Sequence, residues 1–143
     1  MFMGEYNHTV DAKGRVIIPA KFRDRLGEEF VVSKGLDGCL FVHGNNEWQK
    51  FVDKLLELPS GKKDARQFAR YFLAGAENVG VDKQGRILLS EVLRTAATID
   101  KDVVVIGVGS RIEIWSRDSW EGITDNIDAE EIAEQMALLG MGI

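Results

Sequence analysis

The apolar positions of this chain fall in short runs, and polar loops that contain glycine separate these runs. Short apolar runs bounded by turn residues are typical of β-strands. Residues 6–11 and 15–18, joined by Ala12-Lys13-Gly14, therefore predict a β-hairpin. Within it, the unbroken run Val16-Ile17-Ile18 predicts a strand that is covered on both faces.

A short helix and a second hairpin are predicted next. Pro19 suits the first turn of a helix over residues 20–26, and Gly27 suits its end. Residues 30–33 and 39–43 are the expected strands of the second hairpin.

The same order of elements returns in the second half of the chain. The sequence Val10-Asp11-Ala12-Lys13-Gly14-Arg15 recurs 71 positions later as Val81-Asp82-Lys83-Gln84-Gly85-Arg86, and three aliphatic residues follow each copy. Ser90 is expected to cap the second short helix. The remaining elements of the second copy are predicted as strands at 79–81, 86–89, 103–108 and 111–115 and a helix at 91–97. The repeat indicates a duplicated module that presents one charged tip twice.

The repeat also predicts the domain organisation of an α+β protein. Two modules, residues 5–47 and 76–119, flank a helical linker at 48–75, and a helical tail follows at 120–143. Each module is near the size below which a domain rarely buries enough core alone, so the two are expected to share one core. Asn46 is expected to cap a linker helix that runs through Leu58, and a second linker helix is expected over residues 63–73. In the tail, an apolar stripe predicts a helix over residues 129–139 with Met136 and Met141 as packing residues, and Gly107-Val108-Gly109 is expected to be a turn between strands.

Charge complicates the choice of a partner. The net charge of −5 argues against nucleic acid. However, residues 1–71 carry 12 basic and 10 acidic side chains, whereas residues 72–143 carry 6 and 13. The single cysteine, Cys39, is expected to be a buried small hydrophobe in a reducing compartment. With no long apolar segment and no signal peptide, the chain is expected to be soluble and cytoplasmic, without membrane contact.

Two interpretations of the repeated tips remain open. The aspartate and the arginine of each tip, four positions apart, can form an ion pair that stabilises a tight turn, with glycine at a positive φ angle. Alternatively, Lys13 and Lys83 in the two loops favour contact with phosphates of DNA, because lysine and arginine make most backbone contacts to DNA.

The tips and their surroundings resemble the MraZ family. The resemblance covers about residues 1–120. Apart from the two tips, the matching segments are Met1-Phe2-Met3-Gly4-Glu5, Val16-Ile17-Ile18-Pro19-Ala20-Lys21-Phe22-Arg23, Leu40-Phe41, Glu47-Trp48, Ala74-Gly75-Ala76 and Glu113-Ile114-Trp115. His43-Gly44 and Ser90 depart from the family pattern, away from the tips.

The resemblance implies two SpoVT-AbrB type swapped-hairpin modules that form one pseudo-two-fold barrel. It also implies a bacterial DNA-binding transcriptional regulator, usually a repressor of its own division and cell-wall gene cluster, that binds repeated short promoter sites. Closed, octamer-like homo-oligomeric rings at the nucleoid are the implied assembly. The expected DNA-contacting residues are Arg15, Arg86, Lys13 and Lys83, with Lys21 and Arg23 as weaker candidates, and Asp11, Asp82, Gly14 and Gly85 are expected to position the tips.

Two other classes of function compete with this interpretation. An enzyme finds little support, because His8 and His43 are the only histidines and no metal-binding, nucleophile or phosphate-loop motif is present. No catalytic residue, cofactor, metal or small-molecule substrate is therefore expected. The alternative to a DNA-binding regulator is a structural or protein-interaction ring whose tips grip neighbouring subunits.

Overall fold

The computed structural model describes all 143 residues and has an α+β fold, as predicted. The strands are β1 (Phe2–Thr9), β2 (Arg15–Ile17), β3 (Glu29–Lys34), β4 (Leu40–Gly44), β5 (Glu77–Gly80), β6 (Arg86–Leu88), β7 (Asp102–Gly109) and β8 (Arg111–Ser116). The helices are α1 (Ala20–Leu26), α2 (Asn45–Leu56), α3 (Lys63–Ala74), α4 (Glu91–Ala96), α5 (Arg117–Thr124) and α6 (Ala129–Ala137).

Strands from the two copies of the repeat alternate in one antiparallel sheet of order β1-β7-β8-β4-β3-β5. The pairs β1–β7, β4–β8 and β3–β5 each join one copy to the other. The repeat makes β1 equivalent to β5, β3 to β7 and β4 to β8. When each strand is replaced by its equivalent in the other copy, the order read from β5 to β1 is the same as the order read from β1 to β5. A separate ribbon of β2 and β6 also joins the two copies. Neither copy completes its strand pairing alone.

The prediction that residues 6–11 and 15–18 pair with each other as a β-hairpin is wrong. β1 pairs with β7 and β2 pairs with β6, so the loop at residues 11–14 connects strands of two different sheets. Two backbone hydrogen bonds close the turn, one from the N–H of Asp11 to the carbonyl of Arg15 and one from the N–H of Gly14 to the carbonyl of Asp11. The second predicted hairpin is confirmed, because β3 pairs directly with β4.

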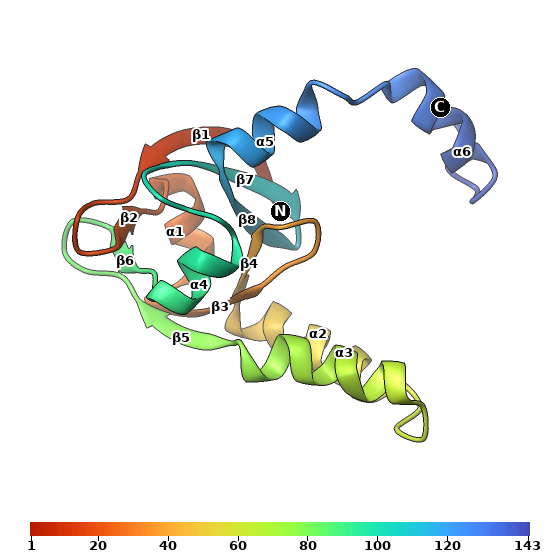
Figure 1. Ribbon diagram of the computed structural model, residues 1–143, viewed down its shortest axis with the longest axis horizontal. Coiled ribbons are helices and arrows are strands. Elements are labelled where there is room, and N and C mark those ends of the chain that lie inside the picture. Colours follow the sequence, from red (N-terminus) through yellow and green to blue (C-terminus); the bar gives the residue numbers. More distant parts are fainter.

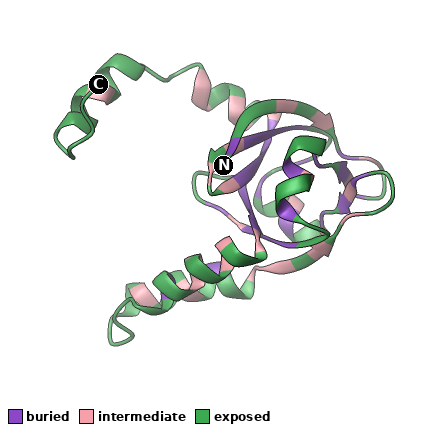
Figure 2. Cartoon of the chain, turned by 180° about the vertical axis from the view of Figure 1, so that it is seen from behind, coloured by how far each residue is buried: buried purple, intermediate pink, exposed green.

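The six-stranded sheet curves around α1 and α4, as Figure 1 shows, and the β2–β6 ribbon lies at one end. The larger core cluster contains 19 buried residues, and both copies contribute to it. Phe22 and Leu26 of α1 and Leu93 of α4 face this core, and the buried positions in Figure 2 follow the sheet and the inner helices. The two copies thus share one hydrophobic core.

A smaller core cluster lies on the other face of the sheet. It combines Phe41, Val104, Ile106 and Trp115 of the sheet with residues of α2 and α3, among them Phe72. Val103 and Val105 belong to the larger cluster, so successive residues of β7 face two cores. This double coverage explains the unbroken apolar run in β7.

The prediction that Val16-Ile17-Ile18 is covered on both faces is wrong. Val16 is 1% exposed, but Ile17 is 41% exposed. The reason is that β2 pairs only with β6 in a two-stranded ribbon. One face of this ribbon covers the core, and nothing in the chain covers the other.

Several element ends also differ from expectation. Asn46 is no cap, because α2 begins at Asn45 with Gly44 at its N-cap and no side-chain cap bond. Gly107, Val108 and Gly109 are all residues of β7, and the turn to β8 comes at Ser110, directly after Gly109, whose φ is 73°. The helix α5 had no specific prediction, because its first three residues were expected to end the second module and the rest to be part of the helical tail.

The predicted packing role of Met136 and Met141 is wrong within this chain, because both side chains are exposed. The C-terminal helix α6 extends away from the sheet (Figure 1), so its apolar stripe meets no apolar surface of the same chain. No helix of the structure has the length and apolar character needed to span a bilayer.

Candidate nucleic-acid interface

The first tip is organised by the carboxylate of Asp11. Its Oδ1 accepts the backbone N–H groups of Lys13 at 3.0 Å and Arg15 at 2.9 Å, and its Oδ2 accepts Nε of Arg15 at 2.8 Å. The backbone N–H of Gly14 also donates to the carbonyl of Asp11 at 2.9 Å. One aspartate therefore fixes both the turn and the direction of the arginine side chain.

The second tip repeats this arrangement. Asp82 accepts the backbone N–H groups of Gln84 and Arg86, both at 2.9 Å, and Nε of Arg86 at 2.8 Å. In addition, Nη2 of Arg86 donates to Oε1 of Gln84 at 3.3 Å. The ion pair expected between aspartate and arginine is thus present in both tips. We call each unit, Asp11 with Arg15 and Asp82 with Arg86, a clamp.

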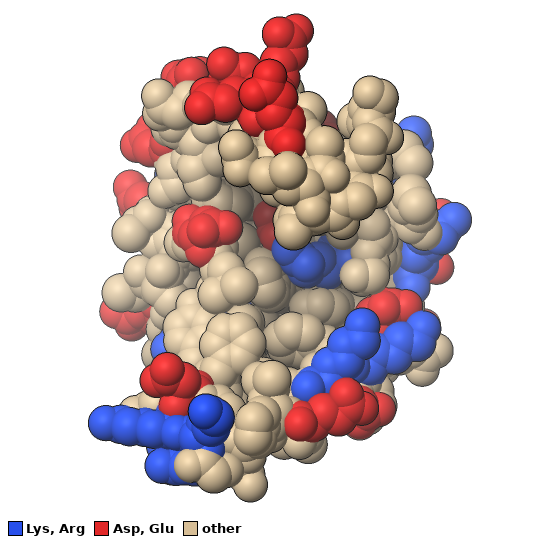
Figure 3. Space-filling model, turned by 90° about the vertical axis from the view of Figure 1, so that its right-hand side faces the viewer, with Lys and Arg blue, Asp and Glu red and all other residues tan.

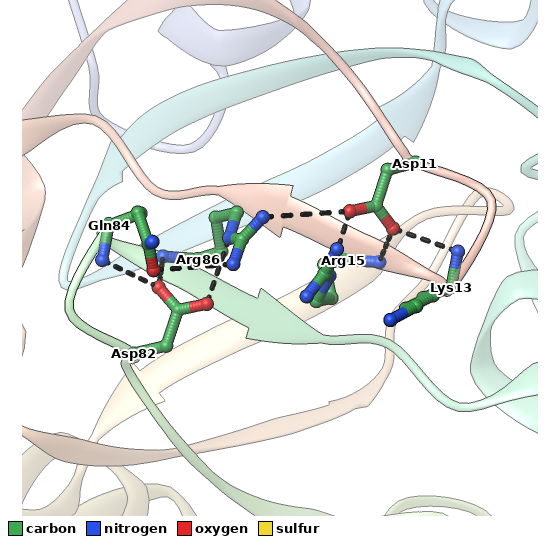
Figure 4. A network of polar contacts seen from close by, with 6 residues as sticks. All are labelled: Asp11, Lys13, Arg15, Asp82, Gln84 and Arg86. Atoms are coloured by element: carbon green, nitrogen blue, oxygen red, sulfur yellow. Dashed lines mark hydrogen bonds and ion pairs between the residues drawn. The ribbon is translucent and has the colours of Figure 1, made fainter.

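The ribbon brings the two clamps side by side (Figure 4). The backbone N–H of Ile18 donates to the carbonyl of Gly85 at 3.0 Å, and that of Leu89 donates to the carbonyl of Gly14 at 2.9 Å. Nη1 of Arg86 lies 3.8 Å from Oδ2 of Asp11, so the second arginine also contacts the first aspartate. The clamps form one continuous surface at the end of the molecule opposite α3 and α6 (Figure 1).

The glycine of each tip has a positive φ angle, 85° at Gly14 and 79° at Gly85. Each glycine also leaves room for an arginine from the short helix of the other copy. A Cβ atom at Gly85 would overlap Nη1 of Arg23, and one at Gly14 would lie 3.3 Å from the guanidinium of Arg94. Nε of Arg94 also donates to the carbonyl of Leu89 at 3.0 Å. Arg23 and Arg94 therefore pack beneath the opposite tips.

Arg94 is the site residue that the sequence prediction missed. The signal was present, because Arg94 follows Arg23 by the same 71 positions that separate the tips. The repeat predicted the second short helix at residues 91–97, but no role was assigned to Arg94.

Hydrogen bonds keep both tip aspartates charged. The backbone N–H of Arg15 is the main cause that lowers the pKa of Asp11, and the guanidinium of Arg15 and the N–H of Lys13 lower it further. The N–H of Arg86 has the same dominant effect on the pKa of Asp82, followed by the guanidinium of Arg86 and the N–H of Gln84. The clamps therefore remain ion pairs at neutral pH.

The predicted lysines are exposed, but they do not occupy equivalent positions. In the repeat, Lys13 corresponds to Gln84, and Lys83 corresponds to Ala12. Lys21 is exposed on the first turn of α1. None of the three lysines takes part in an ion pair within the chain. Their ammonium groups are free to meet an external anion.

Charges at the other end of the molecule have a different character. Figure 3 shows this end, where acidic side chains gather over α6 and basic side chains gather near the end of α2 and α3. The acidic residues of the tail therefore lie far from the two clamps.

The remaining candidate groups belong to the core rather than to the tips. Cys39 is buried, as predicted, and burial raises the pKa of its thiol to about 12, so the thiol is protonated at neutral pH. His43 is 4% exposed and packs against Phe41, Trp48 and Phe51. His8 lies half-buried in β1. No group of three histidine, cysteine or acidic side chains is arranged to hold a metal ion.

The sequence matches one protein family along most of its length. Residues 1–71 and 72–139 each match the family model described as "MraZ protein" and as antitoxin-like. The "Transcriptional regulator MraZ" of Lachnoclostridium phytofermentans is 61% identical over 142 residues, which cover 99% of each chain. The proteins of the same name from a Thermoanaerobacter species and from Clostridium tetani are 59% and 54% identical, over 95% and 99% of this chain and 96% and 100% of their own lengths. The chain therefore belongs to the MraZ family.

Proposed function

We propose that this protein is a transcriptional regulator that binds specific double-stranded promoter DNA through its two clamps. The observation that carries the proposal is the pair of matching clamps side by side on one ribbon, each with an arginine held in a fixed direction. A two-stranded ribbon fits the major groove of B-DNA. The names of the relatives agree with this function.

Each residue of the site has a distinct proposed role. Arg15 and Arg86 contact base edges, because arginine can bind guanine through two hydrogen bonds. Asp11 and Asp82 bind Nε of these arginines, and the two Nη groups of Arg15 have no hydrogen-bond partner in the chain. In Arg86, Nη2 donates to Gln84 at 3.3 Å and Nη1 lies 3.8 Å from Asp11, so a base contact of Arg86 replaces these longer contacts and keeps the bond from Nε to Asp82. The lysines contact phosphates, and Arg23 and Arg94 support the tips from beneath. The phosphate-contacting candidates are Lys13, Lys83 and Lys21, with Arg23 as a supporting contact from beneath the second tip.

The regulated promoter is proposed to be that of the protein's own division and cell-wall gene cluster, with the protein as repressor. This part of the proposal rests on membership of the MraZ family. The site would consist of repeated short sequences, one for each DNA-contacting subunit. The place of action is then the cytoplasm, at the nucleoid, and the chain acts without catalysis or a cofactor.

We further propose that the interleaved strands form one swapped-hairpin barrel with pseudo-two-fold symmetry. Its two SpoVT-AbrB modules are residues 5–47 and 76–119, with the linker at 48–75 and the tail at 120–143. The symmetric strand order supports this assignment.

Copies of the barrel are proposed to assemble into an octamer-like ring through surfaces away from the clamps. Exposed apolar side chains on α3 and α6, among them Phe68, Tyr71 and Ile132, support this location. Of the other aromatic residues beyond the tips, Phe72 is buried, and Phe51 and Trp120 pack against the smaller core. Light scattering at micromolar concentration tests the assembly, and a monomer mass would reject it.

A gel-shift titration of the protein against the DNA upstream of its own gene tests DNA binding. Arg15→Ala should lose the preference for this DNA over unrelated DNA, by about 1–3 kcal/mol for each guanine that the arginine no longer binds. Lys13→Ala should weaken binding to all sequences alike and reduce the salt dependence, by about 0.9 in the logarithmic slope for each phosphate that the lysine no longer neutralises. Arg70→Ala on the exposed face of α3 is the matched control. Since α3 is also a proposed assembly surface, light scattering should show the assembly mass of the wild type, and the variant should then bind DNA as the wild type does.

Two results would contradict these roles. If Arg15→Ala stayed folded and bound the upstream DNA as tightly as the wild type, the clamps would not be the recognition surface. If Arg15→Ala instead abolished folding, a purely structural ion pair would be the better interpretation. Folding is expected to survive, because a partly exposed ion pair contributes about 0–1 kcal/mol to stability.

A further inference from the structure

The outward face of the β2–β6 ribbon carries two exposed aliphatic side chains beside the two clamp arginines. Ile17 is 41% exposed and Leu88 is 59% exposed, whereas Val16 and Ile87 between them are each 1% exposed. Alternate residues of a strand share one face, so Ile17 lies on the face of Arg15, and Leu88 lies on the face of Arg86. We call this surface of Arg15, Ile17, Arg86 and Leu88 the ribbon face.

The strand register fixes the pattern of the ribbon face. Arg15 lies opposite Leu88, and Ile17 lies opposite Arg86. The two arginines therefore occupy one diagonal of the face, and the two aliphatic residues occupy the other. Ile17 and Leu88 are also 71 positions apart, so each copy of the repeat contributes the same pair of one arginine and one aliphatic residue.

The major groove of DNA offers partners for both kinds of side chain at this spacing. Guanine presents two acceptors to an arginine, and thymine presents the C5-methyl group, which apolar side chains contact. Each aliphatic side chain lies directly opposite an arginine on the neighbouring strand, and directly opposed residues of a ribbon are close neighbours. The aliphatic side chain therefore reaches the base step that the arginine contacts, or the next one.

We propose that Ile17 and Leu88 contact thymine methyl groups in the major groove and thereby help to determine sequence specificity. This inference rests on the proposed function, since it requires that the ribbon face meets DNA. It assigns a recognition role to the aliphatic residues of the ribbon, and it requires a thymine within reach of each guanine that an arginine contacts.

The test removes the methyl groups from the DNA without changing its hydrogen-bonding pattern. The DNA upstream of the gene is amplified once with thymidine triphosphate and once with deoxyuridine triphosphate, and the affinity of the full-length protein for each duplex is measured. The wild type should bind the deoxyuridine duplex about fourfold more weakly for each methyl contact, which corresponds to about 0.8 kcal/mol for one buried methyl or methylene group.

Variants show whether the ribbon face causes this difference. The double variant Ile17→Ala, Leu88→Ala should bind both duplexes with equal affinity. Leu36→Ala is the matched control, because Leu36 is also an exposed aliphatic residue but lies in the loop between β3 and β4. This control should keep the full preference of the wild type for the thymidine duplex.

The possible failures are distinguishable. No binding of the wild type to either duplex would overturn the proposed function, and this inference with it. Binding of the wild type to both duplexes with equal affinity would overturn the methyl contact alone, and this comparison needs no variant. A double variant that keeps the preference of the wild type would also overturn it. If that variant in addition changed the mass of the assembly, the ribbon face would be a contact between protein subunits.

Discussion

At the residue scale, the sequence predicted the members of each clamp but not all of their contacts. Aspartate and arginine four positions apart, with glycine before the arginine, were enough to predict a tight turn and an ion pair. The contact of Arg86 with Asp11 was not predictable, because it depends on the pairing of β2 with β6. The packing of Arg23 and Arg94 beneath the opposite tips was not predictable for the same reason, because it depends on how the two copies are arranged.

The buried side chain of His43 gives a prediction on the dependence of stability on pH. Burial, followed by the charge of Arg111, lowers the pKa of His43 from 6.5 to about 4, and its Nδ1 has no hydrogen-bond partner. Between these pH values the unfolded chain binds a proton that the folded chain does not bind. The stability that neutral His43 contributes is therefore complete above about pH 6.5 and is lost as the pH falls towards about 4.

Replacing this histidine should flatten the dependence on pH. The free energy of unfolding of the wild type should fall by about 2 kcal/mol from His43 alone between pH 7 and pH 5, as measured by urea denaturation. His43→Phe should lose this part of the decrease, since a phenyl ring fits among Phe41, Trp48 and Phe51 and does not titrate. His8→Gln is the control, because the pKa of His8 is also lowered but the side chain is only half-buried. An unchanged slope in His43→Phe would contradict the prediction.

At the element scale, local signals placed most helices and strands correctly. As predicted, α1 begins directly after Pro19 and ends directly before Gly27. The hydroxyl of Ser90 accepts the backbone N–H of Leu93 and caps α4, also as predicted. Such signals act over a few residues, so the sequence alone contains them fully. The beginning of α2 was less predictable, because no side-chain cap marks it.

The pairing of strands was the element-scale feature that the sequence did not predict. The turn at residues 11–14 has the composition of a hairpin, but the strands beside it enter different sheets. Nearby residues such as a glycine determine a local turn, whereas the partner of a strand depends on which apolar faces must be covered. The exposure of Ile17 follows from the same cause, since a ribbon in its own small sheet has only one covered face.

At the scale of the whole molecule, the position of charges matters more than their sum. The net charge of −5 first argued against DNA. In the structure, the acidic residues of α6 lie at the end opposite the clamps (Figures 1 and 3). Screening at physiological salt limits the reach of these charges to about 8 Å, so they do not oppose an anion at the clamps.

The shared core leads to a prediction on folding. A fragment of residues 1–75 contains β1 and β2, but their partners β7 and β6 lie in the rest of the chain. The pair β3–β4 is the only strand pair that this fragment retains. The larger core also takes residues from both copies. An isolated fragment of residues 1–75 should therefore show no cooperative unfolding transition as a monomer, as measured by circular dichroism with light scattering. A mixture of fragments 1–75 and 76–143 should restore the transition, because it restores every pairing between the copies.

The matched control keeps both copies and breaks only the chain between them. A protease site inserted in the exposed loop between α2 and α3, at residues 59–61, should allow cleavage without loss of the folded state, because this loop belongs to no strand and both halves of every strand pair remain present. A fragment that folds only by self-association should show a midpoint temperature of unfolding that rises with protein concentration. A sharp transition of monomeric fragment 1–75, independent of concentration, would show that one copy sustains its own core. The interleaved sheet would then be unnecessary for folding, and its symmetric strand order would need another explanation.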